Sequence, residues 1–331
     1  MSLTTAIEQQ LSTLTELEKK SWSINTDHLI WNSPELQSAI GTWDEGIMFL
    51  IGDSSQGKSS FGLQSTLNLL KCNEDVAILD VCLDDSFQER YRRYLSLLSR
   101  VRTSKISRPA ACTGPELSIR EKALDQLKEY ITEGKLEIRS QLEDNYNVIS
   151  NLTNGIREFA KNRPDKKLVL LLDAWHDLSD EKSTSGIDPE KELFRQLNQT
   201  LKDVGMIGII SAHKRKSLTK MLGDRHANDD LKGSGALKYG SKIILSVYND
   251  LKMRRDNALL FWNDSTQNNY KQPILEISIQ KSKVSEYDGN IYYYFNPSTG
   301  NCKEVEPNKS DSCKEIIRKA VVEENIKRGS R

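Results

Sequence analysis

Two glycines, a lysine and a serine in the stretch GDSSQGKS have the spacing of a phosphate-binding loop. Gly52 and Gly57 are separated by four residues, and Lys58 and Ser59 follow directly. Glycines let the backbone curl so that its N–H groups point at an anion, a lysine reaches the terminal phosphates, and a serine hydroxyl can bind Mg²⁺. The pattern predicts a site for a nucleotide and Mg²⁺ formed by Gly52, Asp53, Ser54, Ser55, Gln56, Gly57, Lys58, Ser59 and Ser60.

Acidic residues end two other apolar runs. KLVLLLD ends at Asp173, which we expect to hold Mg²⁺ together with Ser59. VAILDVCL is followed by Asp84, where a carboxylate could orient the water that attacks the γ-phosphate. Each aspartate has a plainer alternative: Asp84 could cap the helix predicted to begin near Ser86, and Asp173 could cap the segment that follows it.

The elements that must position these residues alternate regularly from residue 46 to residue 250. Apolar runs at 47–52, 76–83, 167–173, 205–212 and 242–250, with a shorter one near 135–140, predict strands, and amphipathic stretches between them predict helices. This alternation favours βαβ units and a mostly parallel sheet covered on both faces. Runs at 274–283 and 289–296 predict a C-terminal β-hairpin.

Composition excludes several classes of protein. The 331 residues are 37% hydrophobic and 28% charged, with a formal net charge of zero. No apolar run approaches the roughly 20 residues that span a bilayer, and the polar N-terminal stretch does not resemble a signal peptide. Five widely spaced cysteines indicate reduced thiols rather than disulfides or a zinc site. We therefore expect a cytoplasmic protein without membrane contact.

The order of the motifs resembles the RecA-like ATPase domain of DnaB-type hexameric replicative helicases, over residues 21–305. LDVCLDDSFQER is similar to the segment that carries the family's catalytic glutamate, and Asp84 matches that position. LVLLLDAWHDLS looks like the second motif, with Asp173 as the metal-associated aspartate. GIISAHKRKS resembles the third motif, where His213 would sense the γ-phosphate, and DDLKGSGALKYGSKIILSVYND resembles the fourth.

This resemblance implies an α/β fold with a RecA-like P-loop NTPase core and a C-terminal β-hairpin. It also implies an ATPase that forms a homo-oligomer, with a hexameric ring favoured, and acts on single-stranded DNA. In the family, basic residues of the terminal hairpin reach the ATP site of the neighbouring subunit, and Lys281 and Lys283 match them here. The chain departs from the family in carrying Asp84 for glutamate, Lys283 for arginine and His213 in place of glutamine.

A basic stretch after the third motif predicts contact with nucleic-acid phosphates. A solvated basic loop is the alternative, but its place after the sensor strand favours contact with DNA or RNA. The residues concerned are Lys214, Arg215, Lys216, Lys220, Arg225 and Lys232.

The two ends of the chain are predicted to be small helical appendages. Residues 1–20 would dock on the protein's own core or on a neighbouring subunit, in the place where the family has a primase-binding domain, and residues 306–331 form a charged tail or helix. An alternative function is a KaiC-like ATPase switch that controls a partner protein, which the short appendage, Asp84 and Lys283 favour. A filament-forming recombinase is a weaker third alternative.

Overall fold

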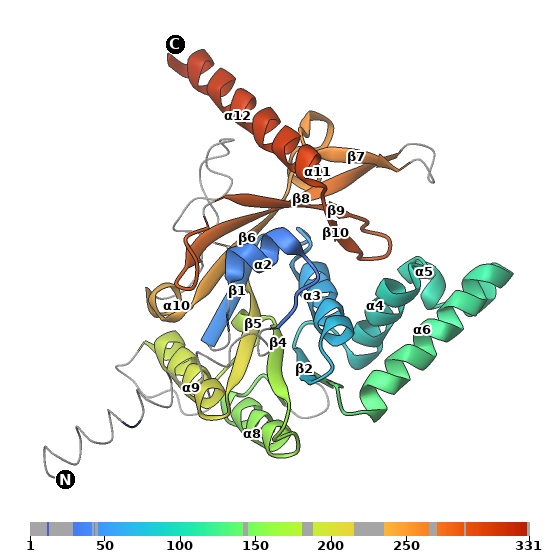
Figure 1. Ribbon diagram of the computed structural model, residues 1–331, viewed down its shortest axis with the longest axis vertical. Coiled ribbons are helices and arrows are strands. Elements are labelled where there is room, and N and C mark those ends of the chain that lie inside the picture. Colours follow the sequence, from blue (N-terminus) through green and yellow to red (C-terminus); the bar gives the residue numbers. More distant parts are fainter. Residues whose placement is uncertain are drawn as a thin grey trace, which may run out of the picture.

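The computed structural model describes residues 29–41, 43, 46–141, 145–180, 188–214, 235–264, 270–287 and 289–329, together with residue 12 (Figure 1). Within these residues ten strands form one sheet, in the order β10-β9-β8-β6-β1-β5-β4-β2-β3, with β7 paired to β8. The strands are β1 (Gly46–Gly52), β2 (Val76–Cys82), β3 (Leu136–Ser140), β4 (Lys167–Asp173), β5 (Met206–His213), β6 (Ile243–Asn249), β7 (Phe261–Asp264), β8 (Tyr270–Ser282), β9 (Asn290–Phe295) and β10 (Cys302–Glu304).

The helices lie between and after these strands. They are α2 (Pro34–Ile40), α3 (Lys58–Cys72), α4 (Phe87–Ser99), α5 (Thr103–Ile106), α6 (Gly114–Thr132), α8 (Ile149–Lys161), α9 (Pro189–Asp203), α10 (Gly235–Gly240), α11 (Asp250–Arg254) and α12 (Pro307–Gly329). Short 3₁₀ turns are η1 (Pro109–Ala111), η2 (Trp175–Asp177) and η3 (Arg255–Asn257).

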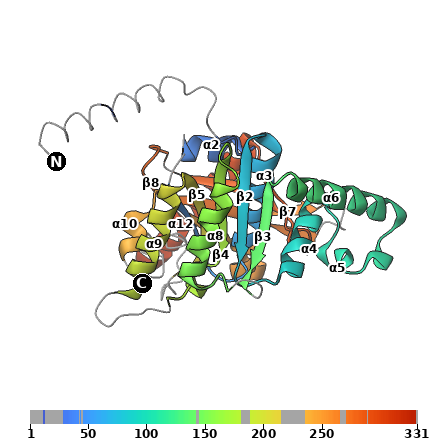
Figure 2. The ribbon, with the colours of Figure 1, turned by 90° about the horizontal axis from the view of Figure 1, so that it is seen from below.

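Helices cover both faces of the parallel part of the sheet, as the continuous apolar runs require. Along β1, Met48 and Leu50 pack into one core with helices α2, α3, α4 and α6. Ile47 and Phe49 point to the opposite face and pack with α8, α9 and α10. Figure 2 shows α8, α9 and α10 on one side of β2 and α3, α4 and α6 on the other.

The strand pairing brings the carboxyl ends of four strands to one edge of the sheet. Strands β6, β1, β5, β4, β2 and β3 run parallel, and β8, β9 and β10 extend the sheet antiparallel. Gly52 lies opposite His213, and Cys82 lies opposite Asp173. In open α/β sheets ligands bind beyond the carboxyl ends of the strands, so this edge is the place to look for a site.

The predicted fold class, strands and terminal hairpin are confirmed. The sequence missed β7 and β10, which have only four and three residues. Within the C-terminal stretch predicted at residues 306–331, α12 (Pro307–Gly329) packs through Cys313 and Ile317 beside β9 and then projects from the body (Figure 1). The helix predicted near the N-terminus lies outside the described residues.

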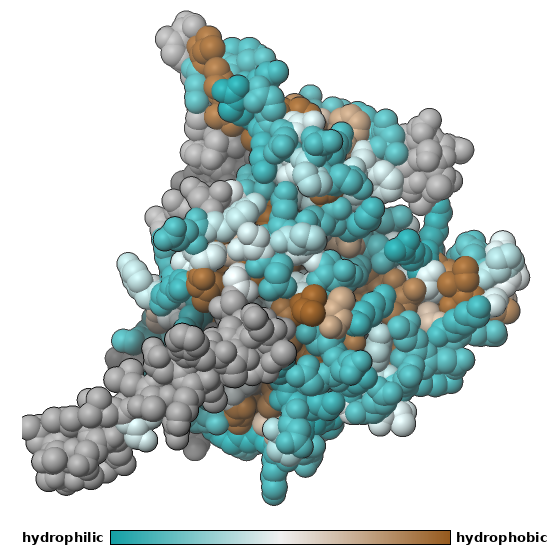
Figure 3. Space-filling view, in the orientation of Figure 1, coloured by the Kyte–Doolittle hydropathy of each residue, from teal (hydrophilic) through white to brown (hydrophobic). Residues whose placement is uncertain are grey.

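Within the residues that the structure describes, no helix is both long and apolar enough to cross a membrane. The face seen in Figure 3 is largely hydrophilic. Large exposed apolar side chains occur on α6 and α12, namely Ile119, Ile131, Ile316, Val322 and Ile326.

Close packing of α10 against α9 predicts a cost for one small substitution. A methyl group at Gly240 would overlap the ring of Phe194, which is itself held between Phe49 and Trp175. We expect Gly240→Ala to lower the free energy of unfolding by about 1–3 kcal/mol, because the ring has no space to yield. At Gly114 a methyl group meets nothing within 4 Å, so Gly114→Ala should be neutral or slightly stabilising. Urea denaturation measures both, and equal stabilities would contradict the prediction.

Candidate active site

The predicted phosphate-binding loop joins the end of β1 to the start of α3. Gly57, directly before the helix, has φ 102°, a conformation that favours glycine. The Nζ of Lys58 donates hydrogen bonds to the carbonyl oxygens of Gly52 (2.8 Å) and Asp53 (2.9 Å), which holds the cation over the loop. Burial lowers the pKa of Lys58 from its ordinary value, against the opposing effect of nearby aspartates. The loop therefore has the strand–loop–helix setting that the motif requires.

A cleft of about 610 Å³ opens beside this loop. Its loop side is formed by Ser55, Gly57, Lys58, Ser59 and Ser60. The other walls come from α4, the β6–α11 junction and the β8–β9 region, and the residues include Arg93, Asn249, Leu251, Lys252, Lys271, Gln272, Pro273, Phe295 and Pro297. Three cations of these walls, Arg93, Lys252 and Lys271, were not predicted from the sequence.

The other predicted loop residues lie outside the lining of this cleft. Asp53 is half-buried and Ser54 is exposed, whereas the side chain of Gln56 is buried. A larger cavity of about 1110 Å³ lies between α3, α4, β7 and β10. Neither Lys58 nor Ser59 lines that cavity, whereas both line the smaller cleft.

Asp173 and Ser59 meet at the edge of this cleft. The Ser59 hydroxyl is hydrogen-bonded to the Asp173 carboxylate, which also accepts a hydrogen bond from Ser211 on β5. Burial alone would raise the pKa of Asp173, but Arg90 and these hydroxyls outweigh it and hold the pKa below its ordinary value. Asp173 is thus an ionised carboxylate, and it does not cap the turn after it, whose N-cap residue is Ala174 without a side-chain bond.

The donors at this edge fit Mg²⁺. A carboxylate and a hydroxyl are hard oxygen ligands, and Mg²⁺ in nucleotide sites takes one or two such protein groups and completes its shell with phosphates and water. No group of three or more His, Cys, Asp or Glu residues that could hold a metal occurs among the described residues.

Asp84 lies at the same edge, directly after β2. Its backbone N–H donates to the carbonyl oxygen of Asp173 (3.4 Å). Burial raises the pKa of Asp84, and so do the charge and hydrogen bond of Asp177 and the charge of Asp173, while His213 opposes them. The alternative that Asp84 caps α4 is wrong, because Ser86 is the N-cap and forms a capping box with Glu89. Asp177 was not predicted, since nothing in the sequence pairs it with Asp84.

His213 lies at the end of β5, opposite Gly52 and close to Asp84. Its ring stacks on that of His176, with centroids 5.4 Å apart and planes 8° from parallel. The structure thus brings Lys58, Asp84, Asp173 and His213 to one edge of the sheet.

Lys281 and Lys283 are at the other end of the parallel strands. Lys283 donates to the carbonyl of Tyr239 (2.7 Å) and Lys281 to that of Ser241 (2.8 Å), at the end of α10. Burial and the neighbouring Lys283 lower the pKa of Lys281 to about 8. The N–H of Lys283 donates to the carbonyl of Lys242, and the N–H of Lys242 donates to the carbonyl of Ile47. Ile47 precedes Gly52 by five residues, which is about 17 Å along strand β1. Neither lysine lies beside the loop of its own chain.

Of the predicted nucleic-acid contacts, only Lys214 is described. Its backbone N–H donates to the carbonyl of Gly52 (3.3 Å), so the basic stretch leaves the sheet beside the phosphate-binding loop. The other five, Arg215, Lys216, Lys220, Arg225 and Lys232, lie outside the described residues.

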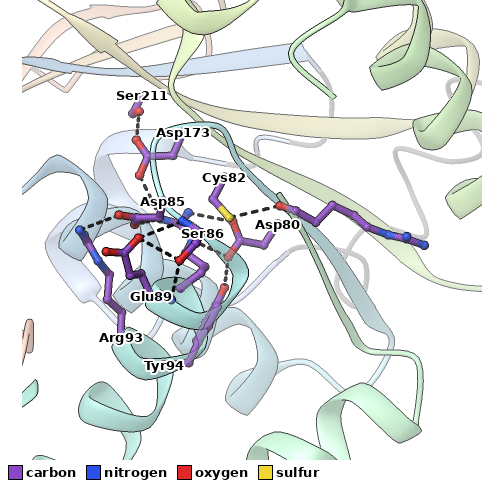
Figure 4. A network of polar contacts seen from close by, with 11 residues as sticks. Asp80, Cys82, Asp85, Ser86, Glu89, Arg93, Tyr94, Asp173 and Ser211 are labelled. Atoms are coloured by element: carbon purple, nitrogen blue, oxygen red, sulfur yellow. Dashed lines mark hydrogen bonds and ion pairs between the residues drawn. The ribbon is translucent and has the colours of Figure 1, made fainter. Parts of the chain in front are cut away.

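A buried arginine behind the site was also missed. Arg90 on α4 is fully buried, and its Nη1 donates to Asp173 Oδ2 at 3.0 Å. Figure 4 shows Ser211, Asp173, Asp85, Asp80 and Tyr94 gathered around this network of contacts. Arginine in an amphipathic helix usually marks the exposed face, so the helical pattern gave no signal for it.

Comparisons with known proteins show what the fold of the chain is similar to. No family model matches the chain, and no curated protein matches it. Among solved structures, an ATPase domain is 17% identical, with a TM-score of 0.70, over 91% of this chain and 99% of that one. A DnaB-like replicative helicase, solved in a study of its interactions with primase, is 17% identical, with a TM-score of 0.65, over 90% of this chain and 67% of that one.

A third solved structure is that of a KaiC-like protein. The KaiC-like protein PH0186 of the archaeon Pyrococcus horikoshii OT3 is 13% identical, with a TM-score of 0.53, over 84% of this chain and 99% of that one. At these identities the likeness concerns the fold, which is the RecA-like fold of the ATPase domains of DnaB-type helicases.

Proposed function

We propose that this protein binds Mg·ATP in the cleft beside β1 and hydrolyses it. The observation that carries the proposal is the meeting of Lys58, Ser59 and Asp173 at one edge of a parallel sheet. Lys58 would pair with the β- and γ-phosphates, and Ser59 and Asp173 would hold Mg²⁺. The bound metal would neutralise the charge that develops on the transferred phosphoryl group. Asp84 would orient the attacking water, and His213 would contact the γ-phosphate.

We infer further that hydrolysis drives movement along single-stranded nucleic acid within a homo-oligomeric ring. Three observations support this: the motif order, the basic stretch that starts at Lys214 beside the loop, and the similarity in fold to a DnaB-like replicative helicase. Lys281 and Lys283 support the ring, because they lie away from the loop of their own chain and would serve the site of the next subunit.

A regulatory switch is the second candidate. The likeness to a KaiC-like protein favours it, as do Asp84, one methylene shorter than glutamate, and Lys283, which lacks arginine's bidentate fork. In this case nucleotide occupancy would control the assembly of a partner protein, without unwinding.

The proposed shared site predicts that two inactive variants restore each other. Lys58→Ala should abolish hydrolysis because the phosphates lose their cation, and Lys283→Ala should bind nucleotide but not turn it over. Mixed subunits should regain activity, because roughly a quarter of head-to-tail interfaces would pair an intact loop with an intact Lys283. ATP turnover of each variant and of the mixture tests this. Full turnover by Lys58→Ala would overturn the nucleotide site, and a mixture without activity would overturn the shared site. Lys128→Ala, on exposed α6, is the control.

The pKa of Asp84 predicts the acidic side of the pH profile. A carboxylate that orients water must be ionised, so turnover should fall as the pH drops through the raised pKa of Asp84. Asp177→Asn removes a repelling charge and a hydrogen bond, which lowers that pKa, so the acidic limb should move to lower pH by about one unit. Measuring kcat from acidic to neutral pH tests this. Asp125→Asn on α6 is the control, and an unmoved limb in Asp177→Asn would remove Asp84 from this role.

The effect of single-stranded DNA on ATP turnover distinguishes the two proposed functions, motor and switch. For a motor, DNA should stimulate ATP turnover, and stimulation should fade with added salt because phosphate contacts release counterions. Replacing Lys214, Lys216 and Lys220 with glutamine should reduce the slope of log affinity against log salt by about 0.7 for each phosphate that is no longer neutralised. The same change at Lys122, Lys128 and Lys161, which are exposed on α6 and α8, should leave the slope unchanged. Turnover that ignores DNA at every salt concentration would favour the switch.

A further inference from the structure

A fully buried arginine connects the core of the sheet to the metal side of the site. Arg90 and Asp80 have side chains with no exposed surface. The Arg90 guanidinium binds Asp80 in a bidentate arrangement, Nε to Oδ2 at 2.9 Å and Nη2 to Oδ1 at 2.8 Å. The hydroxyl of Tyr94, one turn further along α4, donates to Asp80 Oδ2 at 2.8 Å. The Nε and Nη2 atoms of the guanidinium are therefore held by Asp80 on β2, which leaves Nη1 to contact the site.

The remaining end of the same guanidinium reaches Asp173. Arg90 Nη1 donates to Asp173 Oδ2 at 3.0 Å, while Ser211 donates to Oδ1 of the same carboxylate. The Asp173 carboxylate is thus held on each of its oxygens by a separate element, α4 on one side and β5 on the other. Ser59, which also contacts this carboxylate, lines the cleft.

A weaker branch runs from the same arginine to the cleft wall. Arg90 Nη1 lies 3.7 Å from Asp85 Oδ2, and Asp85 Oδ1 accepts a hydrogen bond at 3.0 Å from Arg93, which lines the cleft. The buried cation therefore faces three carboxylates, those of Asp80, Asp85 and Asp173, and one of them belongs to the metal site.

We propose that Arg90 is a positioning residue for the metal site: anchored by Asp80, it sets the orientation in which Asp173 meets Mg²⁺. This inference rests on the proposed nucleotide site. Carboxylates that bind metals are oriented by hydrogen bonds from groups behind them, and loss of such a group typically costs 10–100-fold in metal affinity or activity. A buried ion pair can instead be only structural, and the two roles predict different results.

The test removes both charges of the anchor together. Arg90→Met alone would leave the carboxylates of Asp80 and Asp173 buried without their cation, and its loss of stability would hide any effect on the metal. Asp80→Leu/Arg90→Met replaces the pair with apolar side chains, an exchange that buried ion pairs often tolerate, and leaves Asp173, still hydrogen-bonded to Ser211, as the carboxylate that has lost Arg90. Tyr94→Phe is the matched control, since it removes a neighbouring hydrogen bond to Asp80 but leaves both contacts of Arg90, to Asp80 and to Asp173, in place.

The readout is the affinity for Mn²⁺ in the presence of ADP, from the electron paramagnetic resonance signal of free Mn²⁺. ATP turnover and thermal unfolding are measured on the same samples. We expect the double variant to bind Mn²⁺ about 10–100-fold more weakly than the wild type, and Tyr94→Phe to bind it as the wild type does. Arg90→Lys keeps a buried cation but loses the fork, and should weaken Mn²⁺ binding in the same direction.

The outcomes separate the two proposals. If the wild type binds Mn²⁺ with ADP and a folded double variant binds it equally well, the positioning role is wrong. If the double variant does not fold, unchanged affinity in Arg90→Lys would refute the positioning role instead. If Tyr94→Phe and the Arg90 variants lose Mn²⁺ affinity equally, the network has only a structural role and the positioning role is wrong. A wild type without Mn²⁺-dependent ADP binding would overturn the nucleotide site itself.

Discussion

The arrangement of the candidate site depends on Asp173, the last residue of β4. Its backbone carbonyl accepts hydrogen bonds from the N–H groups of Leu83 (2.6 Å) and Asp84 (3.4 Å), which ties the segment after β2 to the end of β4. Its side chain contacts Ser59 on α3, Ser211 on β5 and Arg90 on α4. One residue thus connects the start of α3, the segment with Asp84 and strand β5.

Asp173 can hold this position as a charged group because its desolvation is compensated locally. A buried carboxylate is costly unless it is paired and hydrogen-bonded, and here a cation and two hydroxyls meet that condition. The burial of that cation, Arg90, is offset in turn by the carboxylates around it. Burial alone would lower the pKa of Arg90, but Asp80 and Asp173 keep it well above its ordinary value. Buried ion pairs often contribute little net stability. Here the pair of Arg90 and Asp80 fixes the orientation of the guanidinium, whose other end contacts Asp173.

The residue pattern is sufficient to predict the main strands and helices and to bring the glycine loop and Asp173 together. Continuous apolar runs ending in a glycine loop or an aspartate place Gly52 and Asp173, and strand–helix alternation gives the parallel sheet that brings them together. Strands β7 and β10 are too short to leave a periodic signal.

Arg90 and Asp177 could not be found from spacing, because contacts between elements decide their partners. One signal for Arg90 was present. Asp80 interrupts the apolar run VAILDVC, and a charged residue inside a buried strand requires a partner of opposite charge. The sequence offers several arginines in the next helix, and only the fold selects Arg90 among them.

The two ends of the parallel sheet carry different halves of the proposed chemistry. The loop, Asp84 and Asp173 lie at the carboxyl end, whereas Lys281 and Lys283 lie near the start of β6, bound to the last carbonyls of α10. Those carbonyls accept hydrogen bonds from the lysines but carry no full negative charge. Burial and repulsion by Lys283 lower the pKa of Lys281 to about 8, so binding of an anion there would stabilise the charged lysines. In the proposed assembly that anion is the nucleotide of the next subunit. Such a contact is head-to-tail, and its rotation decides between a closed ring and an open filament. Because each site would then be completed by a neighbour, hydrolysis would depend on assembly, and a motor and a switch would share this contact while differing in what the assembly acts on.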